Sequence, residues 1–146
     1  MKLIVQRCNS AQVQVDGEII GRVGRGMMVL LCVLRGDGPD QAKRLAAKLA
    51  TYRFFPDQEG RMNESALDQG LGALVISQFT LAADGRRGRR PSFDQAAPAE
   101  LPEPLVEHFV ACLRVCHIGA PRSVRGLQRE THRGALRAMP RGTICG

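Results

Sequence analysis

Runs of apolar residues, some continuous and some alternating with polar residues, predict the order of the secondary-structure elements. Four strands are expected at residues 2–6, 12–15, 18–23 and 27–34, with a hairpin turn at residues 16–17. Helices are expected at residues 40–51 and 105–116, a short strand at residues 54–55, and a proline-rich linker at residues 98–104. The apolar side chains of the first helix share one face, so we expect this helix to cover a sheet.

Residues 73–81 are the most informative stretch, because an apolar run there is joined by three polar side chains. The run is typical of a strand buried on both faces, yet it contains Ser77, Gln78 and Thr80. Burying an unpaired hydroxyl or amide costs about 1–3 kcal/mol, so a core strand has no structural reason to hold three. Since side chains alternate along a strand, we expect Gln78 and Thr80 on one face with Ile76, and Ser77 on the other. A strand that runs out into solvent, with its hydroxyls bonded to backbone, is the alternative.

A loop rich in arginine follows this strand. Its basic side chains are Arg86, Arg87, Arg89 and Arg90. A polar strand end beside a cationic loop suggests an anionic ligand, and the sequence pI of about 9.8 suits a partner that carries phosphate groups. The alternative is a solvated basic loop that keeps the protein soluble.

Several segments together resemble one known family. Ser77-Gln-Phe-Thr-Leu81, then Ala82-Ala-Asp84 and Arg90-Pro-Ser-Phe93, resemble the signature of the D-aminoacyl-tRNA deacylases, and Val5-Gln-Arg7 and Tyr52-Arg-Phe54 resemble the same family in the same order. The likeness runs from residue 1 to about Cys116. It implies an α+β fold of a single domain, with a twisted, mostly antiparallel sheet or barrel covered by two to three helices, usually in a homodimer. It also implies hydrolysis of the ester bond of D-aminoacyl-tRNA in translation quality control, with mischarged glycyl-tRNA as a further candidate substrate.

The resemblance also implies site residues, without a metal ion or other cofactor. Backbone N–H groups and the Gln78 amide would hold the ester carbonyl as its oxygen gains charge. No histidine, lysine or carboxylate lies within the motif to activate the Thr80 hydroxyl, so we prefer positioning of water to direct attack by threonine. The expected catalytic residues are Ser77, Gln78, Phe79 and Thr80, and the expected residues of the substrate pocket are Met62 and Phe93.

The last thirty residues differ from the rest of the chain. Residues 117–146 contain six arginines, no lysine and one acidic residue, whereas residues 1–116 contain fifteen basic and thirteen acidic residues. We therefore divide the chain into a deacylase-like domain, residues 1–116, and an atypical arginine-rich segment, residues 117–146. The family closes with an Asn-x-Gly-Pro motif whose cis Gly-Pro enters the partner's pocket and rejects L-amino acids. The nearest approach here is Met139-Pro-Arg-Gly142.

Three explanations compete for this segment: a shifted reading frame, a divergent arginine-rich arm, or another element that supplies the same wall. We prefer the first, because a frame shift in a GC-rich gene tends to yield arginine, glycine, alanine and proline.

Length and composition agree with one domain in the cytoplasm. At 146 residues the chain can form an independent core, and it has neither an 18-residue apolar run nor a leader-like start, so we expect no membrane partner. Five cysteines suit reduced thiols, most of them buried as small apolar side chains. His108, Cys112 and Cys116 are spaced to share a helix face, but a metal site there is disfavoured because the spacing is not that of zinc sites.

Two other classes of function remain open: a non-catalytic relative that binds RNA or tRNA, and a dimeric interaction domain in which the polar strand residues only satisfy backbone groups.

Overall fold

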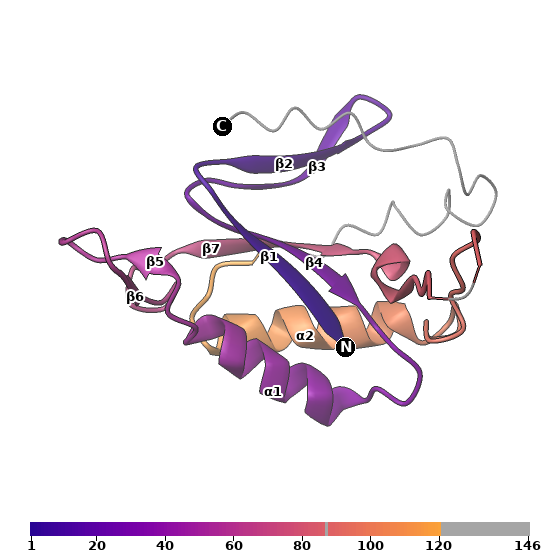
Figure 1. The fold of residues 1–146 in the computed structure, drawn as a ribbon. Coiled ribbons are helices and arrows are strands. Elements are labelled where there is room, and N and C mark those ends of the chain that lie inside the picture. The colour runs from indigo at the N-terminus through magenta and orange to yellow at the C-terminus, as the bar shows by residue number, and fades with distance from the viewer. Residues whose placement is uncertain (87, 121–146) are drawn as a thin grey trace.

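The computed structural model describes residues 1–86 and 88–120, and a three-stranded sheet lies at its centre (Figure 1). β1 (Lys2–Cys8) pairs antiparallel with β4 (Gly26–Cys32), which pairs in parallel with β7 (Gly72–Ser77). The remaining described strands form two antiparallel pairs, β2 (Ala11–Val15) with β3 (Glu18–Val23) and β5 (Phe55–Pro56) with β6 (Met62–Glu64). The expected α+β class with mostly antiparallel pairing is confirmed.

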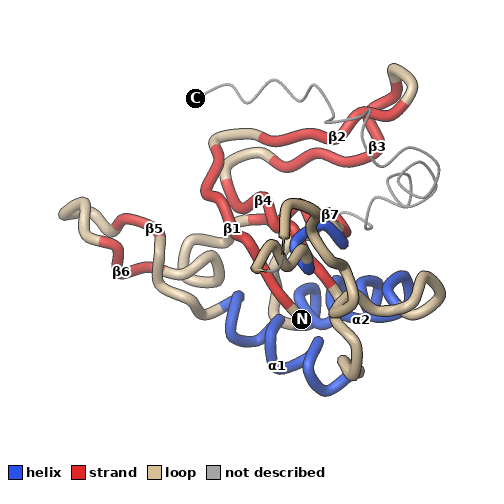
Figure 2. The backbone as a smooth tube through the Cα atoms, turned by 45° about the vertical axis from the view of Figure 1, so that its right-hand side comes forward, coloured by secondary structure: helices blue, strands red, loops and turns tan. Residues whose placement is uncertain are grey.

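Two α-helices cover one face of the central sheet. α1 (Pro39–Ala50) and α2 (Pro102–Val115) lie on the side opposite the β2–β3 hairpin, as Figures 1 and 2 both show. Among the residues that the structure describes, no helix is both long enough and apolar enough to cross a membrane.

Alternation along β4 and β7 divides their side chains between the two faces. Met27, Val29 and Leu31 face the helices, and with Ala73, Val75 and Phe109 they belong to the main core. Met28 and Leu30 join a smaller cluster with Leu74, Ile76 and Val13 of the hairpin. Because both faces of β4 and β7 pack against other elements, these strands carry the continuous apolar runs from which they were predicted.

Backbone conformation explains the hairpin and the end of α2. Asp16 and Gly17 both have positive φ, 50° and 87°, as a tight two-residue hairpin turn requires, so the predicted turn is confirmed. His117 also has a positive φ of 61°, and the N–H groups of His117 and Ile118 donate to the carbonyls of Arg114 and Leu113. These bonds form a Schellman C-cap.

The chain remains packed after this cap. Ile118 is buried in the main core, and the Gly119 carbonyl accepts a hydrogen bond of 2.9 Å from the N–H of Ala73 in β7. Close packing thus continues for four residues past the expected domain boundary at residue 116. The prediction for residues 121–146 lies outside the described residues.

Three sequence-based expectations differ from the structure. The strand expected to run through Thr80 ends at Ser77, and residues 79–82 form a 3₁₀-helix, η1 (Phe79–Ala82), so Gln78 and Thr80 do not share a strand face with Ile76. The N–H of Gln78 still donates to the Leu31 carbonyl at 2.8 Å, but β4 ends one residue later and offers no further pairing.

The other two differences concern proline and a short strand. α2 begins at Pro102, inside the expected linker, because proline at the first position of a helix loses no hydrogen bond. Strand β6 was not predicted, since its three residues show no apolar alternation.

Candidate active site

The turn after β7 brings Gln78 and Thr80 together. The Gln78 amide nitrogen donates a hydrogen bond to the Thr80 hydroxyl oxygen, and the Thr80 side chain is exposed. Because the hydroxyl accepts this bond, its own hydrogen is available for donation to another group. Ser77, at the end of β7, is half-buried and takes part in other contacts. The pairing of amide and hydroxyl expected from the sequence is therefore present, although the 3₁₀-turn rather than a strand creates it.

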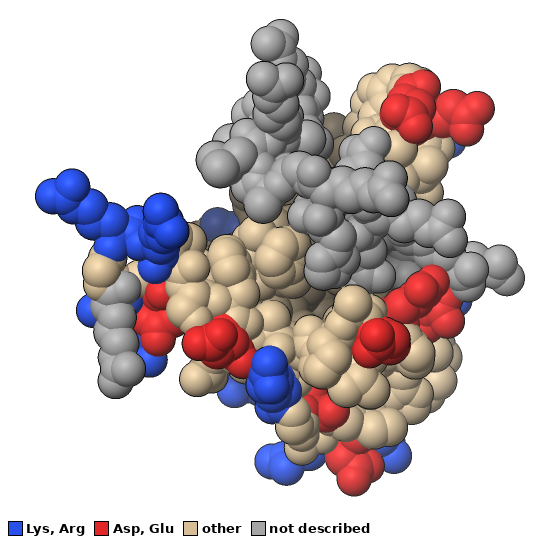
Figure 3. All heavy atoms as spheres, turned by 90° about the vertical axis from the view of Figure 1, so that its right-hand side faces the viewer, with Lys and Arg blue, Asp and Glu red and all other residues tan. Residues whose placement is uncertain are grey.

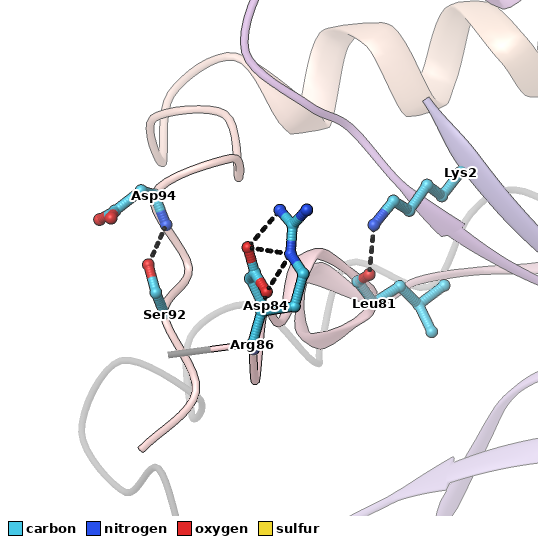
Figure 4. A network of polar contacts seen from close by, with 6 residues as sticks. All are labelled: Lys2, Leu81, Asp84, Arg86, Ser92 and Asp94. Carbon is cyan, nitrogen blue, oxygen red and sulfur yellow. Dashed lines mark hydrogen bonds and ion pairs between the residues drawn. The ribbon is translucent and has the colours of Figure 1, made fainter. Parts of the chain in front are cut away.

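Two residues from other strands contact the carbonyl groups of η1, and no pattern in the sequence predicts either contact. The Lys2 ammonium donates to the Leu81 carbonyl at 3.2 Å (Figure 4), and the Cys32 thiol lies 3.6 Å from the Phe79 carbonyl. Cys32 is only 1% exposed, and burial raises the pKa of its thiol. The thiol therefore stays protonated near neutral pH and can act as a donor.

The structure brings one of the two expected pocket residues to this turn. The rings of Phe79 and Phe93 are 5.4 Å apart and tilted by 54°, so Phe93 packs directly on η1. Met62 lies on β6, in the hairpin beside the start of β7, whereas Gln78 and Thr80 follow the other end of that strand (Figures 1 and 2). Within one chain, Met62 does not join the group around Thr80.

The arginine loop is closed at its base by backbone pairing. Asp84 and Ser92 exchange two hydrogen bonds of 2.8 Å, and the Asp84 carboxylate accepts bonds from Arg86, the shortest of them 2.6 Å (Figure 4). Hydrogen bonds from the Arg86 side chain lower the pKa of Asp84 to about 2, and the same contact raises the pKa of Arg86. Arg86 therefore holds the loop together and is partly neutralised.

The remaining arginines of the loop differ from Arg86. Arg89 and Arg90 are exposed and make no salt bridge with any residue that the structure describes, while Arg87 lies outside the described residues. On the face that carries this loop, basic side chains project at one edge and acidic ones lie between them (Figure 3). Among the described arginines of the loop, Arg89 and Arg90 are therefore the two whose charge is exposed and not paired in a salt bridge.

The cysteines are less buried than the sequence suggested. Only Cys32 is buried among the four described, while Cys8, Cys112 and Cys116 are half-buried and Cys145 lies outside the described residues. The Cys112 sulfur lies 3.6 Å from the Nε2 atom of His108, one helical turn away. In the described part of the chain, no three or more histidine, cysteine or acidic side chains are grouped as a metal ion would require.

Comparison with known proteins agrees with this geometry. The family model described as D-Tyr-tRNA(Tyr) deacylase matches residues 4–132. A D-aminoacyl-tRNA deacylase of Cereibacter sphaeroides is 49% identical over 118 residues, 81% of each chain. Another, of Roseiflexus castenholzii, is 57% identical over 109 residues, 75% of this chain and 69% of its own.

Solved structures extend the likeness to three dimensions. The c-Myc DNA unwinding element binding protein superposes with a TM-score of 0.76 at 32% identity, over 85% of each chain. A probable eukaryotic D-amino acid tRNA deacylase shares the fold, with a TM-score of 0.68 at 20% identity, over 79% of this chain and 67% of its own. The sequence motifs, the fold and these relatives agree, and the chain belongs to the D-Tyr-tRNA(Tyr) deacylase family.

Proposed function

We propose that this chain hydrolyses the ester bond of D-aminoacyl-tRNA, releasing the free D-amino acid and the tRNA in translation quality control. The observation that carries the proposal is the Gln78 amide bonded to the exposed Thr80 hydroxyl, on a 3₁₀-turn directly after a core strand. Relatives at about half identity over most of the chain are named as deacylases, which favours catalysis over RNA binding alone.

The backbone of η1 supplies a donor for the developing charge. The Phe79 carbonyl is directed at the Cys32 thiol, and the peptide bond between Phe79 and Thr80 is trans. Because N–H and C=O point in opposite directions across a trans peptide, the Thr80 N–H is directed away from Cys32. An N–H held in this way can donate to the ester oxygen as water attacks the carbonyl carbon, and one such donor is typically worth about 10²–10³ in rate.

The Thr80 hydroxyl then positions the attacking water. It already accepts a bond from Gln78, so its hydrogen is directed outward to a ligand or water. As the carbonyl re-forms, the bond to the tRNA oxygen breaks, and the proton that the attacking water loses passes to this leaving oxygen. The Lys2 ammonium is bonded to the Leu81 carbonyl and does not serve as the base.

The tRNA is held by the arginine loop and by the two aromatic rings. Arg89 and Arg90 contact phosphates without reading sequence, with Arg87 as a third expected contact, while Arg86 shapes the loop through Asp84. The rings of Phe79 and Phe93 provide an apolar wall for the terminal adenosine. The sequence also predicts Met62 in this pocket. Because Met62 of the same chain lies near the opposite end of β7, a second copy of the chain would have to supply it.

We further propose that the protein acts in the cytoplasm as a homodimer, which rests on the family resemblance. The division at residue 116 and the shifted reading frame after it also remain proposals. Strong preference for D- over L-aminoacyl-tRNA by a well-folded dimer of the 146-residue chain would contradict the frame-shift explanation and point to a substitute wall, with Met139-Pro-Arg-Gly142 as the first candidate.

Hydrolysis of D-tyrosyl-tRNA and L-tyrosyl-tRNA by the purified protein tests the function directly. Thr80→Val removes the hydroxyl at nearly constant volume, and Thr80→Ser retains it. We expect kcat to fall about 10²–10³-fold in the valine variant and to stay near wild type in the serine variant, with thermal midpoints unchanged in both. Loss of activity in step with loss of thermal stability would mark Thr80 as structural. Tight tRNA binding without hydrolysis by the wild-type protein would support the non-catalytic alternative.

A further inference from the structure

Lys2 and Cys32 form one structural unit. They lie directly opposite each other in the antiparallel register of β1 and β4. Residues paired in this way direct their side chains to the same face, with Cβ atoms about 4.5–5.5 Å apart. The Lys2 charge also lowers the pKa of the Cys32 thiol, against the larger effect of burial, which places the two functional groups near each other. One strand pair therefore presents an ammonium and a thiol together, at the end of the sheet.

Both groups are directed at the turn that carries Thr80. The Cys32 thiol lies 3.6 Å from the Phe79 carbonyl and equally far from the Val33 carbonyl, between which its one hydrogen is shared. The Lys2 ammonium lies 3.2 Å from the Leu81 carbonyl. The Phe79 and Leu81 carbonyls belong to the residues on either side of Thr80. The backbone between the two held carbonyls consists of Thr80 and Leu81, so neither end of this segment can rotate without breaking a contact to the sheet.

We propose that Lys2 and Cys32 are positioning residues that together fix the backbone of Thr80, and so direct its N–H and hydroxyl at the substrate. This inference rests on the proposed function for its catalytic part, whereas its structural part stands on the contacts alone.

Kinetics on D-tyrosyl-tRNA separate positioning from RNA binding. Lys2→Met keeps the aliphatic stem without the charge, Lys2→Arg keeps a donor, and Lys43→Met removes an exposed lysine on α1 as the matched control. We expect kcat to fall about 10- to 100-fold in Lys2→Met, with KM within twofold of wild type, partial recovery in Lys2→Arg and no change in Lys43→Met. A rise in KM that depends on salt, with kcat unchanged, would mark Lys2 as a phosphate contact and overturn the proposal.

The thiol requires its own variants. Cys32→Ala removes the donor, and Cys32→Ser retains one if the alanine variant folds poorly. Because both groups hold the same turn, the loss of kcat in the double variant with Lys2→Met should be smaller than the product of the single losses. If the loss of kcat in the double variant equals the product of the two single losses, Lys2 and Cys32 act independently and not as one unit.

A second readout does not require any activity. The backbone amide signal of Thr80 in the NMR spectrum of the free protein should shift in Lys2→Met and in the Cys32 variants, and stay in place in Lys43→Met. An unmoved Thr80 signal would overturn the positioning role even if the enzyme is active. If wild type hydrolyses no D-aminoacyl-tRNA but the signal moves, the proposed function fails and the structural part of this inference stands.

Discussion

The helix-covered face of the central sheet and the polar end of β7 are held by different interactions. On the helix face, Leu31, Val75 and Phe109 are almost fully buried and pack against α1 and α2. At the polar end, which comprises η1 and residues 84–92, hydrogen bonds hold groups that are mostly exposed or half-buried, although Ala82 of η1 is buried. Burial stabilises a fold far more than single exposed bonds do, so the stability of this molecule should reside on the helix face and its chemistry at the polar end.

The largest expected effect comes from two neighbouring leucines on opposite faces of β4. Leu31 is fully buried under the helices, and Leu30 is half-buried against the hairpin cluster. Leu31→Ala should lower the free energy of unfolding by about 3–5 kcal/mol, because it leaves a cavity among the helices, and Leu30→Ala by about 1–2 kcal/mol. Urea denaturation with equal m-values measures both. Equal losses would mean that the two faces contribute alike.

A smaller effect is expected where the polar end has its own apolar contact. Phe93→Ala removes the ring that packs on Phe79, and since Phe93 is 36% exposed the loss should be about 1 kcal/mol. Phe93→Leu should recover part of it. If Phe93→Ala lowered the thermal midpoint as far as Leu31→Ala does, the polar end would be part of the stabilising core.

Capping of α2 offers an effect of opposite sign. His117 adopts a left-handed conformation that favours glycine, so His117→Gly should raise the free energy of unfolding by a few tenths to about 1 kcal/mol. The matched control is His108→Gly, an exposed position inside the same helix, which should lose about 1 kcal/mol. Two changes of the same sign in thermal unfolding would contradict the capping role.

The smallest effect on stability is expected in the arginine loop. The pKa of Asp84, about 2, is depressed from 3.8 by Arg86, so the stabilisation it provides is present above pH 3.8 and is lost as pH falls through about 2. Carbon NMR of the carboxyl group should show this midpoint in wild type and a value nearer 3.8 in Arg86→Gln. At neutral pH, where this stabilisation is fully present in wild type, Arg86→Gln should lower the thermal midpoint only slightly, because the pair is exposed to solvent. A marked drop in the thermal midpoint at neutral pH would mean that the arginine loop contributes substantially to the stability of the fold.

Local patterns predicted the elements that depend on neighbours in sequence. Strand Glu18–Val23 was predicted at its observed bounds, and the Asp16-Gly17 turn and both helices were predicted within a few residues. These elements follow from alternation, helical periodicity and turn chemistry, all of which act over short ranges.

Features set by distant residues could not be predicted in this way. The strand expected to reach Thr80 stops at Ser77 because its partner β4 ends, and the length of a partner strand is not visible in residues 73–81. The contact between Lys2 and Leu81 joins residues 79 positions apart, and the opposition of Lys2 and Cys32 depends on the register of two strands. The motif thus located the turn that carries Gln78 and Thr80, while the groups that hold this turn became visible only in the fold.

The parallel pairing of β4 with β7 has a consequence for synthesis of the protein. Residues 33–71 separate the two strands, so β4 leaves the ribosome before its parallel partner exists. At typical translation rates this gap lasts about 2–8 s, much longer than most elementary folding events. During that interval β4, with the sequence Gly-Met-Met-Val-Leu-Leu-Cys, has one unpaired edge and two apolar faces. The nascent chain should therefore depend on chaperones between the emergence of β4 and that of β7, and aggregation of truncated chains should rise steeply over that window.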